Sequence, residues 1–242
     1  MCIRDRVKAM RLAEKWEEPR VFKPGGRHAA MLDGVPKEKR RARIGEIAAG
    51  MNHWAIPQEE GMHLRETVHS GLLIGAVKCK GDKALCAHCL KNGVRTEETA
   101  IHAHHKCPKA KAVWKIVIAD WNDKMGDQVS ASDVTATVAG LRTCPEGVTG
   151  KTKEEWQRRE PAWRLLHAVT LLEIYRARCR THEAYHAKTR STPNATSGKE
   201  VVRKIKERLQ QRVGGEYEKA KQAKQHSHEE GPMATFQERW IT

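Results

Sequence analysis

The stretch CAHCLKNGVRTEETAIHAHHKCPKAKAVW, residues 86–114, concentrates the cysteine and histidine side chains of this chain. Four of them follow the pattern Cys86-x2-Cys89-x12-His102-x4-Cys107, which fits a structural zinc template: a close Cys pair, a loop, and two ligands three to five residues apart. Two intervening residues let the Cys86 and Cys89 sulfurs converge on one ion. Four protein ligands fill a tetrahedral zinc ion and leave no position for a reacting water, so the spacing predicts a structural site.

Other side chains near this pattern are alternative ligands. His102 is predicted as the ligand because its spacing to Cys107 matches the template best. The open alternatives are His88, His104, His105 and Cys79.

Helical patterns surround the Cys/His stretch. Pro108 predicts the start of a helix, since its missing N–H would be unpaired there anyway, and residues 110–125 carry an apolar stripe that includes Trp114. Residues 163–175 form the most apolar helical pattern, and Glu160-Pro161 is a potential break before it. Residues 200–213 repeat the pattern with a basic face. The prediction is a mainly α fold in which a small zinc knuckle packs on a helical segment.

Four regions are expected along the chain. Residues 1–62 form a basic N-terminal region, weakly ordered with one or two helices, and residues 63–126 form the zinc-binding domain. Residues 127–190 hold a connector and the apolar helix that packs on that domain. Residues 191–242 hold a basic helix and a polar tail, so both basic termini are expected to be partly disordered.

Composition indicates the kind of partner and the compartment. The chain has 45 Lys and Arg against 30 Asp and Glu, a net charge of +15, which favours a polyanion such as RNA or DNA, although solubility alone is another interpretation. A membrane partner is not expected, because no run of about 18 apolar residues occurs. Seven clustered cysteines, an odd number, argue against a secreted disulfide framework, so an intracellular location, nuclear or cytoplasmic, is predicted.

The residues of this stretch resemble a known family. The shared pattern is a Cys pair, then Glu98-Thr99, then His102, then Cys107-Pro108, and finally an apolar helix with Trp114. The stretch is similar to the zinc-binding domain that follows the reverse transcriptase in non-LTR (LINE-type) retrotransposon polyproteins. The resemblance is close over about 30 residues and looser to residue 180. Several non-ligand positions agree together with the ligands, which makes the motif specific.

The resemblance implies a nucleic-acid-contacting role beside an upstream reverse transcriptase domain of the parent polyprotein. No paired-Asp polymerase motif occurs in this sequence, so the chain is expected to be no enzyme by itself: a C-terminal piece or a decayed copy of the parent RNA-directed DNA polymerase. Preference for RNA or DNA, sequence specificity and oligomeric state stay open. The expected phosphate contacts around the zinc are Lys91, Arg95, Lys106, Lys109 and Lys111.

Two alternative functions belong to other classes. A zinc-scaffolded protein-interaction domain would use the same ligands. A zinc metallopeptidase is suggested by His182-Glu183-Ala184-Tyr185-His186, which fits HExxH. Charged flanking segments and the absence of an evident third ligand favour a solvated helix end for that motif instead.

Overall fold

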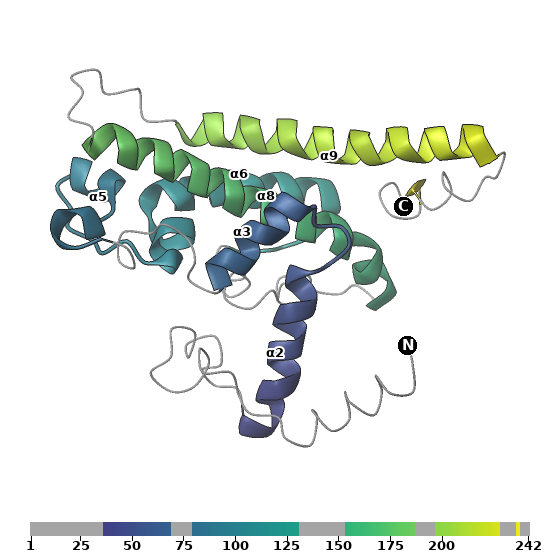
Figure 1. Cartoon of the computed structure of the whole chain (residues 1–242), viewed down its shortest axis with the longest axis horizontal. Coiled ribbons are helices and arrows are strands. Elements are labelled where there is room, and N and C mark those ends of the chain that lie inside the picture. The colour runs from purple at the N-terminus through teal and green to yellow at the C-terminus, as the bar shows by residue number, and fades with distance from the viewer. Residues whose placement is uncertain (1–35, 69–78, 131–152, 187–196, 228–235, 238–242) are drawn as a thin grey trace. The chain divides into compact units, whose positions relative to one another are not determined.

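The structure, a computed structural model, describes residues 36–68, 79–130, 153–186, 197–227 and 236–237 (Figure 1). The chain divides into two compact units, residues 1–45 and 46–242, and helix α2 (Lys37–Met51) begins in the first. The described residues are mostly helical and contain no strand, which confirms the predicted mainly α fold. The other elements are α3 (Gln58–Val68), the 3₁₀ turn η3 (Gly81–Ala84), α5 (Ala87–Lys91), the π-helical turn η4 (His102–Lys106), α6 (Pro108–Met125), α8 (Lys153–His186) and α9 (Gly198–Ser227).

Several sequence predictions fall on residues outside the described ranges. They concern the weak order expected of residues 1–35, the connector at residues 131–152, and the ends of the polar tail at residues 228–235 and 238–242. Helix α3 runs across the boundary expected between residues 62 and 63.

Helix α6 begins and ends where the sequence predicts. Pro108 occupies its first turn, and Gly126 ends it in the left-handed conformation, φ 64°, with its N–H donating to the Asn122 carbonyl. A glycine suits that position because it has no Cβ to clash. The apolar stripe of α6 is buried and comprises Ala110, Val113, Trp114, Val117, Ile118 and Trp121.

Helix α8 is the central element of the second unit. Elements α3, α5, η4, α6 and α9 all pack on it, and Trp163 meets Trp121 of α6 edge to face at 5.0 Å between ring centroids. The break expected at Glu160-Pro161 does not occur, because α8 continues through Pro161. Proline inside a helix costs about 3 kcal/mol, and here it is offset by burial of the helix on several sides, from Trp163 and Leu165 to Ile174 and Ala177.

Helix α9 is longer than the sequence predicts. It runs through Gly214 and Gly215 to Ser227, although its packing residues Val201, Val202 and Ile205 lie in the first half. Residues beyond 213 are mostly exposed, as expected of a polar tail. Lys, Glu, Ala and Gln follow the two glycines and are strong helix formers, so local propensity supports this extension. Tyr217 also contacts Phe236 edge to face, at 5.4 Å between ring centroids.

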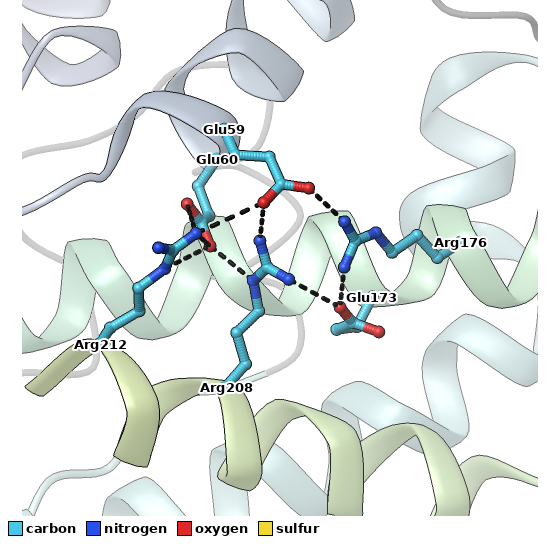
Figure 2. Close-up of polar contacts among 6 residues, drawn as sticks. All are labelled: Glu59, Glu60, Glu173, Arg176, Arg208 and Arg212. Carbon is cyan, nitrogen blue, oxygen red and sulfur yellow. Dashed lines mark hydrogen bonds and ion pairs between the residues drawn. The ribbon is translucent and has the colours of Figure 1, made fainter. Parts of the chain in front are cut away.

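A network of charged side chains ties α9 to α3 and α8 (Figure 2). Glu60 of α3 is fully buried and accepts hydrogen bonds from Arg208 at 2.6 Å and from Arg212 at 3.1 Å. Arg176 of α8 pairs with Glu173 at 2.9 Å and also with Glu59. A buried carboxylate is tolerated only when it is paired and hydrogen-bonded, so Glu60 fixes Arg208 and Arg212 of α9.

Buried histidines of α3, η4 and α8 lie close together in the core. The Nε2 atoms of His63 and His104 are 3.3 Å apart, which joins α3 to η4. The ring of His167 lies 5.6 Å from that of Trp114. Burial lowers the pKa of His63 and His167 to about 3 and that of His104 to about 4, so all three are neutral at pH 7.

The buried histidines predict that acid destabilises the chain. Each histidine has a pKa near 6.5 in the unfolded state, so as the pH falls the unfolded chain binds protons at a higher pH than the folded chain does. The free energy of unfolding is therefore highest above about pH 6.5 and decreases as the pH falls toward 3. The slope is up to about 1.4 kcal/mol per pH unit for each histidine. Thermal melts of the wild type and of His167→Phe, which keeps the aromatic contact, should show a shallower decrease for the variant between pH 6.5 and 4. Parallel decreases would contradict the prediction.

Candidate metal centre

The four predicted ligands come from short elements that precede α6. Cys86 immediately precedes α5 and Cys89 lies within it, while His102 opens η4 and Cys107 directly precedes Pro108 of α6. The segment between the two pairs turns at Gly93, whose φ is 75°, and an isolated bridge pairs residues 85 and 97. The loop therefore folds back, so that the second pair meets the first.

Backbone hydrogen bonds hold this loop in place. The Cys86 N–H donates to the Thr96 carbonyl at 2.9 Å, and the Cys107 N–H donates to the His102 carbonyl at 2.8 Å. The Thr99 hydroxyl accepts a hydrogen bond from the His102 N–H at 3.1 Å. These contacts fix the backbone of three of the four predicted ligands independently of their side chains.

The side chains of the four residues converge. The Sγ atoms of Cys86 and Cys107 are 3.8 Å apart, and Cys89 Sγ lies 3.4 Å from His102 Nε2. All four donor atoms lie within 4.8 Å of one another, and all four residues are buried. Sulfur and imidazole donors this close, shielded from water, could hold a metal ion. Within the described parts of the chain, these four residues are the group of three or more His, Cys, Asp or Glu side chains that could hold a metal ion.

The electrostatics of the cluster favour a thiolate. The hydrogen bond with Cys107 lowers the pKa of the Cys86 thiol and raises that of Cys107. Burial, followed by the charge of Cys86, raises the pKa of Cys89. Cys86 is therefore the thiol that ionises first, and the thiolate is the form of cysteine that binds metals.

The alternative histidines have other surroundings. Nδ1 of His104 lies 2.9 Å from the Ala100 carbonyl, and its Nε2 faces His63. The ring of His105 stacks on Trp114 at 5.4 Å. Neither residue belongs to the convergent group, and neither do His88 or Cys79. The geometry thus brings together the four residues that the spacing predicts.

A buried ion pair connects the loop to α8. Glu98 lies between the two ligand pairs, is 1% exposed, and pairs with Arg178 of α8. The indole N–H of Trp114 also donates to the His104 carbonyl at 2.8 Å. The sequence indicates Glu98 only as a motif position, because nothing in the local spacing points to Arg178 as its partner.

Four of the five predicted phosphate contacts are exposed, and three of these are lysines around the centre. Lys91 ends α5, Lys106 ends η4, and Lys111 lies in the first turn of α6. Their ammonium groups are accessible to a polyanion.

The other two predicted contacts are engaged within the protein. Arg95 is exposed but pairs with Asp82 at 2.7 Å. Lys109 is partly buried and donates to the Thr181 hydroxyl of α8 at 3.1 Å, and burial lowers the pKa of its ammonium group. They are therefore less available to phosphate than the other three.

The HExxH motif ends α8 and is only partly described. His182 is half-buried and Glu183 exposed, whereas the side chains of residues 184–186 lie outside the described set. Among described residues, neither His182 nor Glu183 joins a group that could hold a metal ion.

Comparisons with protein-family models, curated proteins and solved structures found no match to this chain. Within the described ranges, none of the helices is both long and apolar enough to span a bilayer.

Cys86→Ser is expected to weaken metal binding by more than about 100-fold, because even loss of a residue that only supports a ligand costs 10- to 100-fold. Metal content of the purified chain, measured by inductively coupled plasma mass spectrometry, should fall well below that of the wild type. The matched control is Cys179→Ser, which removes a free cysteine outside the cluster and should retain full metal. Equal metal content in both variants would contradict the assignment.

The choice among histidines has its own test. His102→Ala should release the metal, whereas His105→Phe should retain it, because His105 lies outside the cluster and its ring stacks on Trp114. Titration with a competing chelator measures both affinities. Metal loss from His105→Phe with retention in His102→Ala would reverse the ligand assignment.

Proposed function

We propose that this chain is a zinc-binding, nucleic-acid-contacting segment from the C-terminal part of a non-LTR retrotransposon reverse transcriptase polyprotein, and that it is not catalytic by itself. The observation that carries the proposal is the convergence of Cys86, Cys89, His102 and Cys107, within the motif that resembles that family.

Zinc is the metal that suits this donor set best. Three thiolates and one imidazole form a set typical of structural zinc. Two sulfurs bound to one tetrahedral zinc ion, at Zn–S distances of about 2.3 Å, would lie roughly 3.8 Å apart, and Cys86 and Cys107 have that separation, 3.8 Å. Metal binding here would contribute directly to the folding of the loop.

The non-ligand positions of the motif also have defined structural roles. Glu98 pairs with Arg178, Pro108 begins α6, and Trp114 bonds to the backbone of η4. Each contact connects the loop to a long helix. Agreement at these positions supports the resemblance, because they constrain the fold in ways that ligand spacing alone does not.

The surroundings of the centre support a structural rather than a catalytic role. The cavity beside Cys86 and Cys107 has a volume of about 30 Å³, which is room for one or two water molecules and not for a substrate. Four protein donors also fill a tetrahedral coordination sphere. The site would thus stabilise the fold of a surface, and the exposed lysines around it give that surface its positive charge.

Nucleic-acid binding through this surface predicts a salt dependence. The double variant Lys106→Gln/Lys111→Gln should weaken binding of a single-stranded oligonucleotide and reduce the slope of log K against log salt by about 1.4, since each phosphate contact on a single strand contributes roughly 0.7. Fluorescence anisotropy at several salt concentrations measures both quantities.

The matched control removes the same charge elsewhere. Lys124 and Lys206 both pair with Asp120, away from the metal centre, so Lys124→Gln/Lys206→Gln should leave the slope unchanged. Equal effects of both pairs would indicate attraction by net charge alone. Wild-type binding to a protein partner that is insensitive to salt, without oligonucleotide binding, would favour the protein-interaction alternative.

A further inference from the structure

A cavity of about 440 Å³ lies between the segment that joins α2 to α3, helix α8 and helix α9. Its volume falls in the range of small-molecule sites, about 300 to 1,000 Å³. It is distinct from the metal centre, because none of the four clustered residues lines it. The side chains that matter most in its lining are Trp54, Gln58, Leu165, Gln211, Arg212 and Lys219.

Trp54 gives this cavity an aromatic surface. Its side chain is 51% exposed, although the next two residues, Ala55 and Ile56, are buried. The Ile56 N–H donates to the His53 carbonyl at 2.9 Å, and the rings of His53 and Trp54 lie 5.4 Å apart. The backbone around Trp54 is therefore anchored while half of its indole faces solvent, which is an arrangement suited to stacking rather than to core packing.

The polar side chains of the cavity add hydrogen bonding and positive charge. Arg212 donates from Nε to Glu60 and from Nη2 to both Glu59 and Glu60 (Figure 2), while its Nη1 makes no hydrogen bond within the described part of the chain. Gln58 and Gln211 are exposed and carry amide donors and acceptors. Lys219, paired with Glu216 at 3.0 Å, lies at the same cavity.

These features match the needs of one ligand class. A nucleobase presents a flat π-face and an edge of donors and acceptors, and it is attached to a phosphate. The Trp54 indole complements the π-face, the two amides complement the edge of donors and acceptors, and the Arg212 guanidinium complements the phosphate. An apolar peptide would leave the two amides and the Nη1 atom of Arg212 without a hydrogen-bond partner.

We propose that the Trp54 cavity binds an unpaired base of a single-stranded nucleic acid, with the base stacked on the indole and Arg212 directed at the adjoining phosphate. This inference rests on the proposed nucleic-acid-contacting function and deepens it. It adds a second contact region, on α3 and α9, to the exposed lysines around the metal centre.

The test separates the base from the backbone. Binding of the full chain to a fluorescein-labelled oligothymidylate is compared with binding to an abasic oligonucleotide of equal length, at one salt concentration. Stacking is worth about 1 to 3 kcal/mol per base, so the wild type should bind the base-bearing strand about tenfold tighter. Trp54→Ala should remove this preference and leave binding to the abasic strand unchanged.

Two further variants control for unfolding and for general aromatic contacts. Trp54→Tyr keeps an aromatic ring and should retain most of the preference. Tyr217→Ala removes another exposed aromatic side chain, one that does not line the cavity, and should retain all of it. Thermal melts check that each variant is folded.

The outcomes distinguish the two proposals. If the wild type binds both strands equally and with a normal salt dependence, the base site is wrong and the proposed function stands. If Trp54→Ala retains the preference, the base site is likewise wrong. If the wild type binds neither strand, both proposals fail.

Discussion

The structure depends on the burial of α8. This helix has apolar side chains on several faces, and a helix of that kind is stable only when other elements cover it. Helices α3, α5, α6 and α9 and the turn η4 all pack on it. The loop that carries the four clustered residues and the Trp54 cavity are consequently positioned with reference to the same helix, and each contacts it through side chains far away in sequence.

The loop that carries the four clustered residues has little core of its own. Its regular elements are one 3₁₀ turn, one short helix and one π-helical turn, which bury too little apolar surface to offset the entropy of ordering the backbone. Its fixed points are the convergent donors, the Glu98–Arg178 pair and the bond from Trp114 to η4. These contacts explain why the ligands sit directly against α6 and α8 and not on an independent lobe.

The count of 45 Lys and Arg overstates the number of cations that are available to a partner. Arg176 and Arg208 are engaged with Glu59, Glu60 and Glu173, and Arg178 with Glu98. Arg212 is engaged with Glu60 through Nε and Nη2, which leaves only its Nη1 for a partner within the described part of the chain. These arginines hold helices together. The cations that remain exposed, such as Lys106 and Lys111, are fewer, and for that reason they define a surface more sharply than the composition suggests.

The sequence by itself determined the mainly α class, the start and end of α6, and the group of residues that forms the cluster, because each depends on spacing over a few residues or one short loop. It did not reveal that α8 continues through Pro161, since burial on several sides outweighs the local cost of proline. The tertiary structure alone decided that Arg178 meets Glu98, 80 residues away, and that Arg212 meets Glu60, 152 residues away. Such pairings, like the cavity beside Trp54, arise only when helices dock. No local pattern encodes which buried carboxylate will face which arginine.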